Sequence, residues 1–90
     1  MIFEGAEKVE ATVRAVLRDV LGIDEARVAA FAEHTELFGA LPELDSMAVA
    51  GLLTELEDRL AITVDDDEVD GEIFENFGAL VRFAQGKALG

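Results

Sequence analysis

Two stretches of the chain repeat their apolar residues at the spacing of an α-helix, and no stretch alternates convincingly as a β-strand would. In the first stretch the apolar residues are Val9, Val13, Val16, Leu17 and Val20, which fall on one helix face. The second stretch spans residues 46–60 and has a wider stripe, made of Met47, Val49, Ala50, Leu52, Leu53, Leu56 and Leu60. Neighbouring helices must cover such faces, so the spacing predicts an all-α bundle.

We expect a four-helix bundle of three longer helices and one short one, forming a single domain over residues 1–90. The predicted helices span about 4–21, 24–31, 46–60 and 77–86. Their expected N-terminal caps are Asp24, either Asp45 or Ser46, and Asn76. Gly22 and Gly86 are the expected stops of the first and last helices. A short helical turn is expected around residues 72–74, after an acidic run at 65–70.

The long connection over residues 22–45 needs anchors, because a structureless loop of that length is uncommon in a compact domain. Its apolar residues are therefore expected in the core, namely Val28, Phe31, Leu37, Phe38, Leu41 and Leu44. Gly39 and Pro42 supply its turns. Later in the chain, the residues expected to face inward are Ile62, Val64, Phe77, Leu80, Val81 and Ala84.

The supply of reactive side chains is narrow. The chain has no cysteine, one serine (Ser46), one histidine (His34), and neither tyrosine nor tryptophan. The missing thiols exclude disulfides, thiolate metal sites and built-in thiol chemistry, and they favour a cytoplasmic location. A domain of 90 residues also has a modest core, in which a deep catalytic pocket is hard to build. The composition therefore argues against an enzyme.

Acidic residues dominate the charge, since 20 Asp and Glu face 7 Lys and Arg and give a formal net charge of −13. Residues 33–75 alone hold fourteen acids and one base, Arg59. A nucleic-acid binder needs the opposite sign, no apolar run is long enough for membrane insertion, and the N-terminus lacks a signal-peptide pattern. Either the acidic field speeds encounter with basic partners, whose association should then weaken with salt, or it is a solubility coat.

The most informative segment is Leu41-Pro42-Glu43-Leu44-Asp45-Ser46-Met47-Ala48-Val49. In this segment the single serine follows an aspartate at the start of an apolar-striped helix, after a long anchored loop. Asp-Ser at such a place is common as an N-terminal cap, so the dipeptide alone says little about function.

Over residues 35–84 the chain resembles the acyl carrier protein family. The resemblance rests on Asp45-Ser46-Met47, which is similar to the family's Asp-Ser-Leu attachment motif, and on the flanking pattern. That pattern comprises Thr35-x-Leu37-Phe38, Leu52-Leu53-x-x-Leu56-Glu57-x-x-Leu60, Ile62-x-Val64 followed by acids, and Asn76-Phe77-Gly78-Ala79-Leu80-Val81. The sequence around Ser46 is also similar to that of carrier proteins from bacterial exopolysaccharide and exosortase gene clusters.

The resemblance implies a carrier protein rather than an enzyme, with no catalytic residue and no metal ligand of its own. Ser46 would carry a 4′-phosphopantetheine arm, which a phosphopantetheinyl transferase attaches from coenzyme A with Mg²⁺, and Asp45 and Met47 would flank the arm. The arm's thiol would hold acyl groups as thioesters, as in fatty acid or polyketide biosynthesis. An anion on Ser46 would gain roughly 0.3–1 kcal/mol from the positive end of the helix.

The partners that the resemblance implies are the transferase and acyl synthases, ligases or transferases with basic docking patches, which a monomer would visit. The residues expected at partner contacts are Glu43, Asp45, Ala48, Gly51, Glu55 and Asp58, with Glu57 as a further candidate. Met47 stands where the family usually has Leu, a swap that conserves volume, whereas Ala48 stands where many members are acidic. Gly51 indicates approach of a partner or, in our preferred interpretation, contact with a neighbouring helix.

Other interpretations share part of this evidence. An aminoacyl or peptidyl carrier would have the same fold, as would an acidic interaction module whose serine is never modified. Asp66-x-Glu68-x-Asp70-Gly71-x-Ile73 is similar to the first half of an EF-hand, but Phe77 stands where that loop needs its bidentate Glu. Looser divalent-cation binding by the acidic run is a milder version of that idea. A hydrolase using His34 and Ser46 lacks a nucleophile elbow and an oxyanion loop.

The apolar interior has a functional consequence of its own. Its aliphatic and phenylalanine side chains need no buried polar partner, unlike the hydroxyl of tyrosine or the indole of tryptophan. We therefore expect the helices to separate enough to admit an acyl chain between them.

Overall fold

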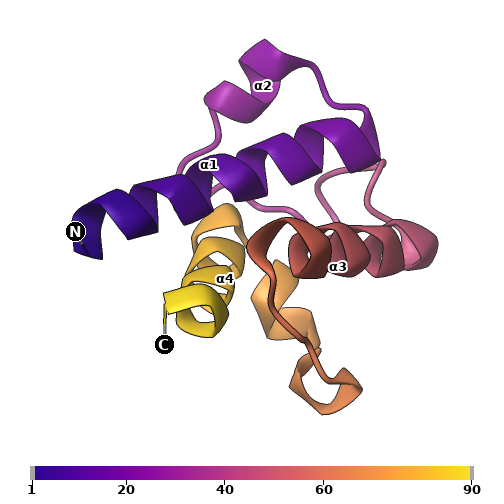
Figure 1. The fold of residues 1–90 in the computed structure, drawn as a ribbon. Coiled ribbons are helices and arrows are strands. Elements are labelled where there is room, and N and C mark those ends of the chain that lie inside the picture. Colours follow the sequence, from indigo (N-terminus) through magenta and orange to yellow (C-terminus); the bar gives the residue numbers. More distant parts are fainter. Residues whose placement is uncertain (1, 90) are drawn as a thin grey trace.

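The computed structural model describes residues 2–89, with side chains from residue 5 onward. It contains four α-helices, α1 (Ile2–Leu21), α2 (Glu25–Ala29), α3 (Ser46–Leu60) and α4 (Phe77–Leu89), and two 3₁₀ turns, η1 (Asp66–Glu68) and η2 (Gly71–Phe74). In Figure 1, α1 runs across the molecule, with α3 and α4 on one side of it and α2 on the other. The predicted helical bundle of three longer helices and one short one is confirmed.

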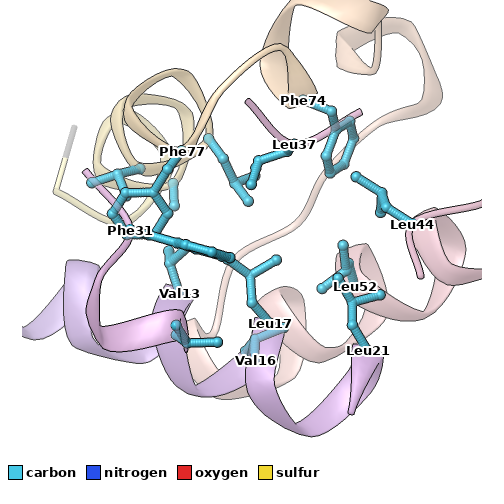
Figure 2. Packing of buried hydrophobic residues seen from close by; sticks show 14 of the residues in the cluster. Val13, Val16, Leu17, Leu21, Phe31, Leu37, Leu44, Leu52, Phe74 and Phe77 are labelled. Atoms are coloured by element: carbon cyan, nitrogen blue, oxygen red, sulfur yellow. The ribbon is translucent and has the colours of Figure 1, made fainter. Parts of the chain in front are cut away.

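The core is wholly apolar, because none of the buried residues with described side chains is polar or charged. Its most deeply buried members are Leu17, Leu37, Leu52, Leu56, Leu80, Val13 and Val16. Figure 2 shows buried side chains converging from the helices, such as Leu17 and Leu52, and from the connecting segments, such as Leu37. The predicted inward faces of α1 and α4 are confirmed, since Val9, Val13, Val16 and Leu17 are buried, as are the four residues predicted for α4.

Helix starts are fixed by the predicted caps. The Asp24 carboxylate accepts a hydrogen bond from the Ala26 N–H, and the Asn76 side-chain oxygen accepts one from the Ala79 N–H. At α3, the cap is Asp45 rather than Ser46, because Asp45 Oδ1 accepts from the Ala48 N–H at 2.8 Å. Such a cap stabilises a helix by about 1 kcal/mol, which is enough to decide where α3 begins.

The connection between α2 and α3 is held by main-chain hydrogen bonds to the start of α4. We call residues 33–38 the strap. The Phe77 N–H donates to Thr35 O at 2.8 Å, and the Phe38 N–H donates to Phe74 O at 2.9 Å. Glu36 and Asn76 form an isolated antiparallel bridge between these two bonds. The strap thereby connects η2 and α4 to the loop that leads to α3.

The strap also depends on close approach at α4. The Gly78 N–H donates to Glu33 O at 2.9 Å, and a Cβ atom on Gly78 would lie 2.9 Å from that same oxygen. The Phe77 ring packs edge-on against Phe31, with ring centroids 5.9 Å apart, and the Arg14 guanidinium lies 4.5 Å from its centre. Because the Glu33 carbonyl oxygen lies so close to the Cα of Gly78, a glycine is required where the strap crosses the first turn of α4.

The burial expected for four apolar residues is wrong. Phe38 and Met47 were expected to face inward but are 53% and 85% exposed, because one lies in the strap beside a groove and the other in the uncovered first turn of α3. Ile62 and Val64 are only half-buried and lie outside the core cluster, since the segment after α3 runs along the surface.

The predicted stop of α4 at Gly86 is also wrong, because the helix continues to Leu89. Contacts beyond the glycine support the last turn: Lys87 pairs with Glu68, and Ala88 packs against the core. The acidic run at 65–70, for which no element was expected, contains η1. None of the helices within residues 2–89 combines the length and the hydropathy that crossing a membrane would require.

Two glycines of α4 give a matched test of the strap. Gly78→Ala should lower the free energy of unfolding by about 1–3 kcal/mol, because the added methyl collides with the Glu33 carbonyl oxygen. Gly86→Ala should raise it by about 1 kcal/mol, since a Cβ there meets no atom within 4 Å and alanine favours the helix. Chemical denaturation of both variants checks this, and equal effects would contradict the role given to Gly78.

Candidate functional site

Ser46 is the first residue of α3 and is exposed to solvent. The first N–H groups of a helix have no partner inside the helix, and the Asp45 cap occupies only that of Ala48. The positive end of the helix dipole and the remaining N–H groups therefore face the region around the serine oxygen. This position suits a covalently attached anion, which would stay accessible to a second protein.

The loop before Ser46 is pinned from both sides. Leu41 and Leu44 are buried, and the Leu44 N–H donates to Leu41 O at 3.0 Å. Between them, Glu43 Oε2 accepts from Arg27 of α2 at 2.9 Å, while Oε1 is buried without a partner. The backbone N–H of Glu43 and the Arg27 guanidinium lower the pKa of the Glu43 carboxyl, so this side chain stays ionised. The predicted partner contact at Glu43 would therefore require displacement of Arg27.

An open groove of ≈ 340 Å³ begins beside Ser46. We call it the Ser46 groove, and its lining residues are Phe38, Ser46, Val49, Val69, Asp70, Gly71 and Phe74. The side chains of Phe38, Val49, Val69 and Phe74 make most of this lining apolar, and they come from the strap, α3, and the segment around η2. The groove thus offers an apolar surface within reach of any group attached to the serine oxygen.

This groove is not predicted by the sequence. The sequence predicts Phe38 in the core and nothing for Val69, because a loop has no periodicity that would separate a core residue from a groove residue. The ring of Phe38 is exposed because it lines the groove and not the core. The capping box of η1, in which Asp65 and Glu68 satisfy each other's backbone N–H groups, could have been recognised from the Asp-x-x-Glu pattern.

Three predicted partner contacts lie along α3 on the same side as Met47, which is predicted to flank the arm. Met47, Gly51, Glu55 and Asp58 follow the spacing i, i+4, i+8 and i+11, which places them on one side of the helix. We call this side the α3 stripe. It borders α1, because a Cβ on Gly51 would lie 3.4 Å from Val20 Cγ1, an ordinary contact distance. The preferred interpretation of Gly51 as a helix contact agrees with this position, although alanine would also fit.

The charged residues of α3 differ in the ion pairs and hydrogen bonds that they form. Glu55 pairs with Arg59, which also pairs with Asp19 of α1, each at 2.9 Å. Hydrogen bonds from Arg18 and Arg59 lower the pKa of Asp19. Glu57 accepts from the Val64 N–H at 2.9 Å and so holds the turn after α3. Asp58 is exposed and makes no ion pair with a described residue, while Ala48 packs against the core.

The geometry of the described residues supports neither of the two alternative chemistries, metal binding and hydrolysis. Among the side chains of residues 5–89, no three His, Asp or Glu are grouped so as to hold a metal ion. Of the EF-hand-like positions, Glu68 is engaged by Lys87, and Asp70 accepts from the Glu72 N–H at the start of η2. His34 and Ser46 are both exposed, and no hydrogen bond joins their side chains.

Comparison with known proteins shows which family the chain is similar to. The family model described as the phosphopantetheine attachment site matches residues 11–84. Among solved structures, the chain is similar to the holo acyl carrier protein of Nitrosomonas europaea, determined in solution by NMR. The two share 41% sequence identity and superpose with a TM-score of 0.77, over 87% of this chain and 92% of that one. A search of curated proteins gives no match.

The chain belongs to the acyl carrier protein family. Its cofactor is a covalently attached 4′-phosphopantetheine, and it is a carrier rather than a catalyst. The residues described above fit this cofactor, since the chain has one serine and that serine lies exposed at a capped helix start beside an apolar groove. Carrier domains of this kind interact with phosphopantetheinyl transferases and with enzymes that handle acyl groups.

The Arg27–Glu43 pair gives a pH-dependent prediction for this acyl carrier protein. Its Glu43 pKa is lowered from the ordinary value of 4.5, so the pair stabilises the fold above that pH and loses its effect as pH falls through the lowered pKa. Arg27→Ala should therefore be less stable than the wild type at neutral pH, and the difference should close in acid. Urea unfolding between about pH 7 and pH 3 measures this difference.

Lys8→Ala is the matched control, because it removes one positive charge from an exposed position where no ion pair is seen among the described residues. A difference that stays constant with pH in Arg27→Ala, or that closes equally in Lys8→Ala, would contradict the role assigned to the pair.

Proposed function

We propose that Ser46 carries the 4′-phosphopantetheine arm and that the protein presents acyl groups on it, as thioesters, to partner enzymes. The observation that carries this proposal is the position of the only serine, which is exposed at the capped start of α3 and next to an apolar groove. In the attachment step, Ser46 Oγ forms a bond to phosphorus in coenzyme A while the bond to the adenosine-bearing phosphate breaks. The serine proton passes to a base of the modifying enzyme.

The chain's own residues act on the attached group in three ways. Free N–H groups in the first turn of α3 orient the phosphodiester, with a gain of roughly 0.3–1 kcal/mol at an exposed position. The pinned loop around Leu41 and Leu44 fixes the serine in space. The Ser46 groove receives apolar parts of the cargo. The arm itself supplies a thiol, which the cysteine-free chain lacks.

The apolar lining of the groove favours an acyl cargo over an aminoacyl or peptidyl one. Burial of an acyl chain stabilises the loaded state by about 0.8 kcal/mol for each CH₂ group removed from water. A peptidyl group would bring amide groups that need hydrogen-bond partners, and the side chains of Phe38, Val49, Val69 and Phe74 offer none. Fatty acyl and polyketide intermediates both fit this description.

The partners we propose approach the α3 stripe and the exposed acids beside it. Asp45 and Asp58 are exposed at either end of α3, and Met47 adds an apolar contact next to the serine. Basic docking patches on a synthase, ligase or transferase would complement this surface. The single-domain organisation, the monomeric state and the cytoplasmic location stay predictions from the sequence.

Modification of Ser46 is tested directly. Incubation of the apo protein with coenzyme A, Mg²⁺ and a broad-specificity phosphopantetheinyl transferase should raise its intact mass by one phosphopantetheine. Ser46→Ala should show no increase, because no second serine exists to accept the arm. Ser46→Thr keeps a hydroxyl at the same place and serves as the control for folding. A label on any other residue, or on Ser46→Ala, would refute the proposal.

Two variants of Asp45 separate its capping role from a role in recognition. Asparagine caps a helix as well as aspartate, so Asp45→Asn should keep the unfolding free energy, whereas Asp45→Ala should lose about 1 kcal/mol. We propose that the modifying enzyme engages the Asp45 carboxylate. Both variants lose this carboxylate, so both should be modified more slowly. Mass spectrometry over time measures the rate, and modification of Asp45→Asn at the wild-type rate would reduce Asp45 to a cap.

A further inference from the structure

The acidic segment, residues 65–70, forms part of the wall of the Ser46 groove. It contains five acids and Val69, and it leads from the end of α3 through η1 towards η2. Val69 and Asp70 line the groove, and Val69 is partly buried against the core. The position of this segment therefore decides how far the groove is open.

One ion pair connects the middle of the acidic segment to the helices. Lys87 Nζ, in the last turn of α4, lies 2.9 Å from both Oε1 and Oε2 of Glu68. Glu68 Oε2 also accepts from the Asp65 N–H at 2.9 Å, so the carboxylate holds the turn together while Lys87 holds the turn to α4. Among residues 5–89, Lys87 is the only base that pairs with the acidic segment.

Apart from the packing of Val69 against the core, the hydrogen bonds that tie this region to α3 and to the strap lie at its two ends. Before it, the Val64 N–H donates to Glu57 of α3, and after it, Phe74 O accepts from the Phe38 N–H of the strap. Between these anchors, Asp65, Asp66, Asp67 and Asp70 are all exposed, and their like charges repel one another. Lys87 supplies the opposing charge. Without it, repulsion among these carboxylates would favour a looser segment, and the groove wall that the segment forms would loosen with it.

We propose that the Glu68–Lys87 ion pair is a latch that holds the acidic segment against the Ser46 groove, and that its opening lets an acyl chain enter or leave. The cargo part of this proposal rests on the proposed function of Ser46. Both side chains of the pair are about one third exposed, at 31% and 27%, so water competes for them and the latch opens readily. Because Val69 follows Glu68 directly, release of Glu68 moves an apolar side chain of the groove wall.

The test of the latch itself uses the unmodified protein. Lys87→Gln should speed amide hydrogen exchange in residues 65–70 by about two- to fivefold, the range expected when a surface ion pair is lost. Exchange in α3 serves as the internal reference for the stability of the whole fold. Lys87→Arg keeps the charge and should restore slow exchange. Unchanged exchange in Lys87→Gln would overturn the proposal.

Arg82→Gln is the matched control. It removes the same charge from the same helix and breaks the ion pair with Glu33, which lies at the strap and not at the acidic segment. It should leave exchange in residues 65–70 at the wild-type rate. A rise equal to that of Lys87→Gln would show that net charge, and not the latch, sets the rate, and would overturn the proposal.

The second measurement concerns cargo. With an octanoyl group on the arm, cleavage of the thioester by hydroxylamine should be several-fold faster in Lys87→Gln than in the wild type and in Arg82→Gln. Faster exchange without faster cleavage would overturn the link between latch and cargo. Failure to attach the arm would already be visible in the intact mass and would refute the proposed function, while the exchange result decides on the latch by itself.

Discussion

The apolar face of α1 is the surface on which the rest of this protein assembles. It packs against α3 and α4 on one side of the molecule, and every buried side chain in the described core is apolar (Figure 2). Apolar contact has no preferred direction, so it does not by itself fix where helices begin or how loops run. Those details come from polar contacts at the edge of the core, such as the Asp45 cap and the main-chain bonds of the strap. Polar contacts at the edge of the core therefore fix the position of Ser46, while the apolar core supports the helix that begins with it.

Bases are scarce in this acidic chain, and the structure uses them as cross-links between distant segments. Arg59 of α3 pairs with Asp19 of α1, and Arg82 of α4 pairs with Glu33 of the strap. Arg27 of α2 pairs with Glu43 in the loop before Ser46. Each exposed pair is worth only about 0–1 kcal/mol, so none of them is essential to the fold. Each joins two segments that already contribute apolar side chains to the core, so the pair adds a polar contact at the edge of that core.

Much of this arrangement could be predicted from the sequence. The bounds of α3 and the caps at Asp24, Asp45 and Asn76 follow from apolar periodicity and capping chemistry, which act within a few residues. The position of Ser46 at the start of α3 follows from the same signals. The sequence predicts where the expected partner contacts lie, but it does not show which of them are already paired within the protein. The pairing of Glu55 with Arg59 and of Glu43 with Arg27 depends on side-chain geometry.

The features that could not be predicted depend on contacts between distant segments. The exposure of Phe38 and Met47 could not be predicted. Periodicity shows which face a residue occupies, but not whether a neighbouring element extends far enough to cover it. Gly86 does not end α4, because Lys87 and Ala88 gain contacts that outweigh the low helix propensity of glycine. The Ser46 groove combines the strap, α3 and the region of η2, which no local pattern connects.

The strap has a consequence for how a protein of this kind could diversify. Its bonds to the start of α4 join backbone atoms, so the side chains at Glu36 and Phe38 contribute little to them. Mutation at Phe38 would reshape one wall of the cavity while leaving the scaffold unmoved, whereas Gly78 tolerates no replacement without displacing the crossing. A change of side chain at Phe38 would thus alter the room for cargo without disturbing the main-chain crossing that depends on Gly78.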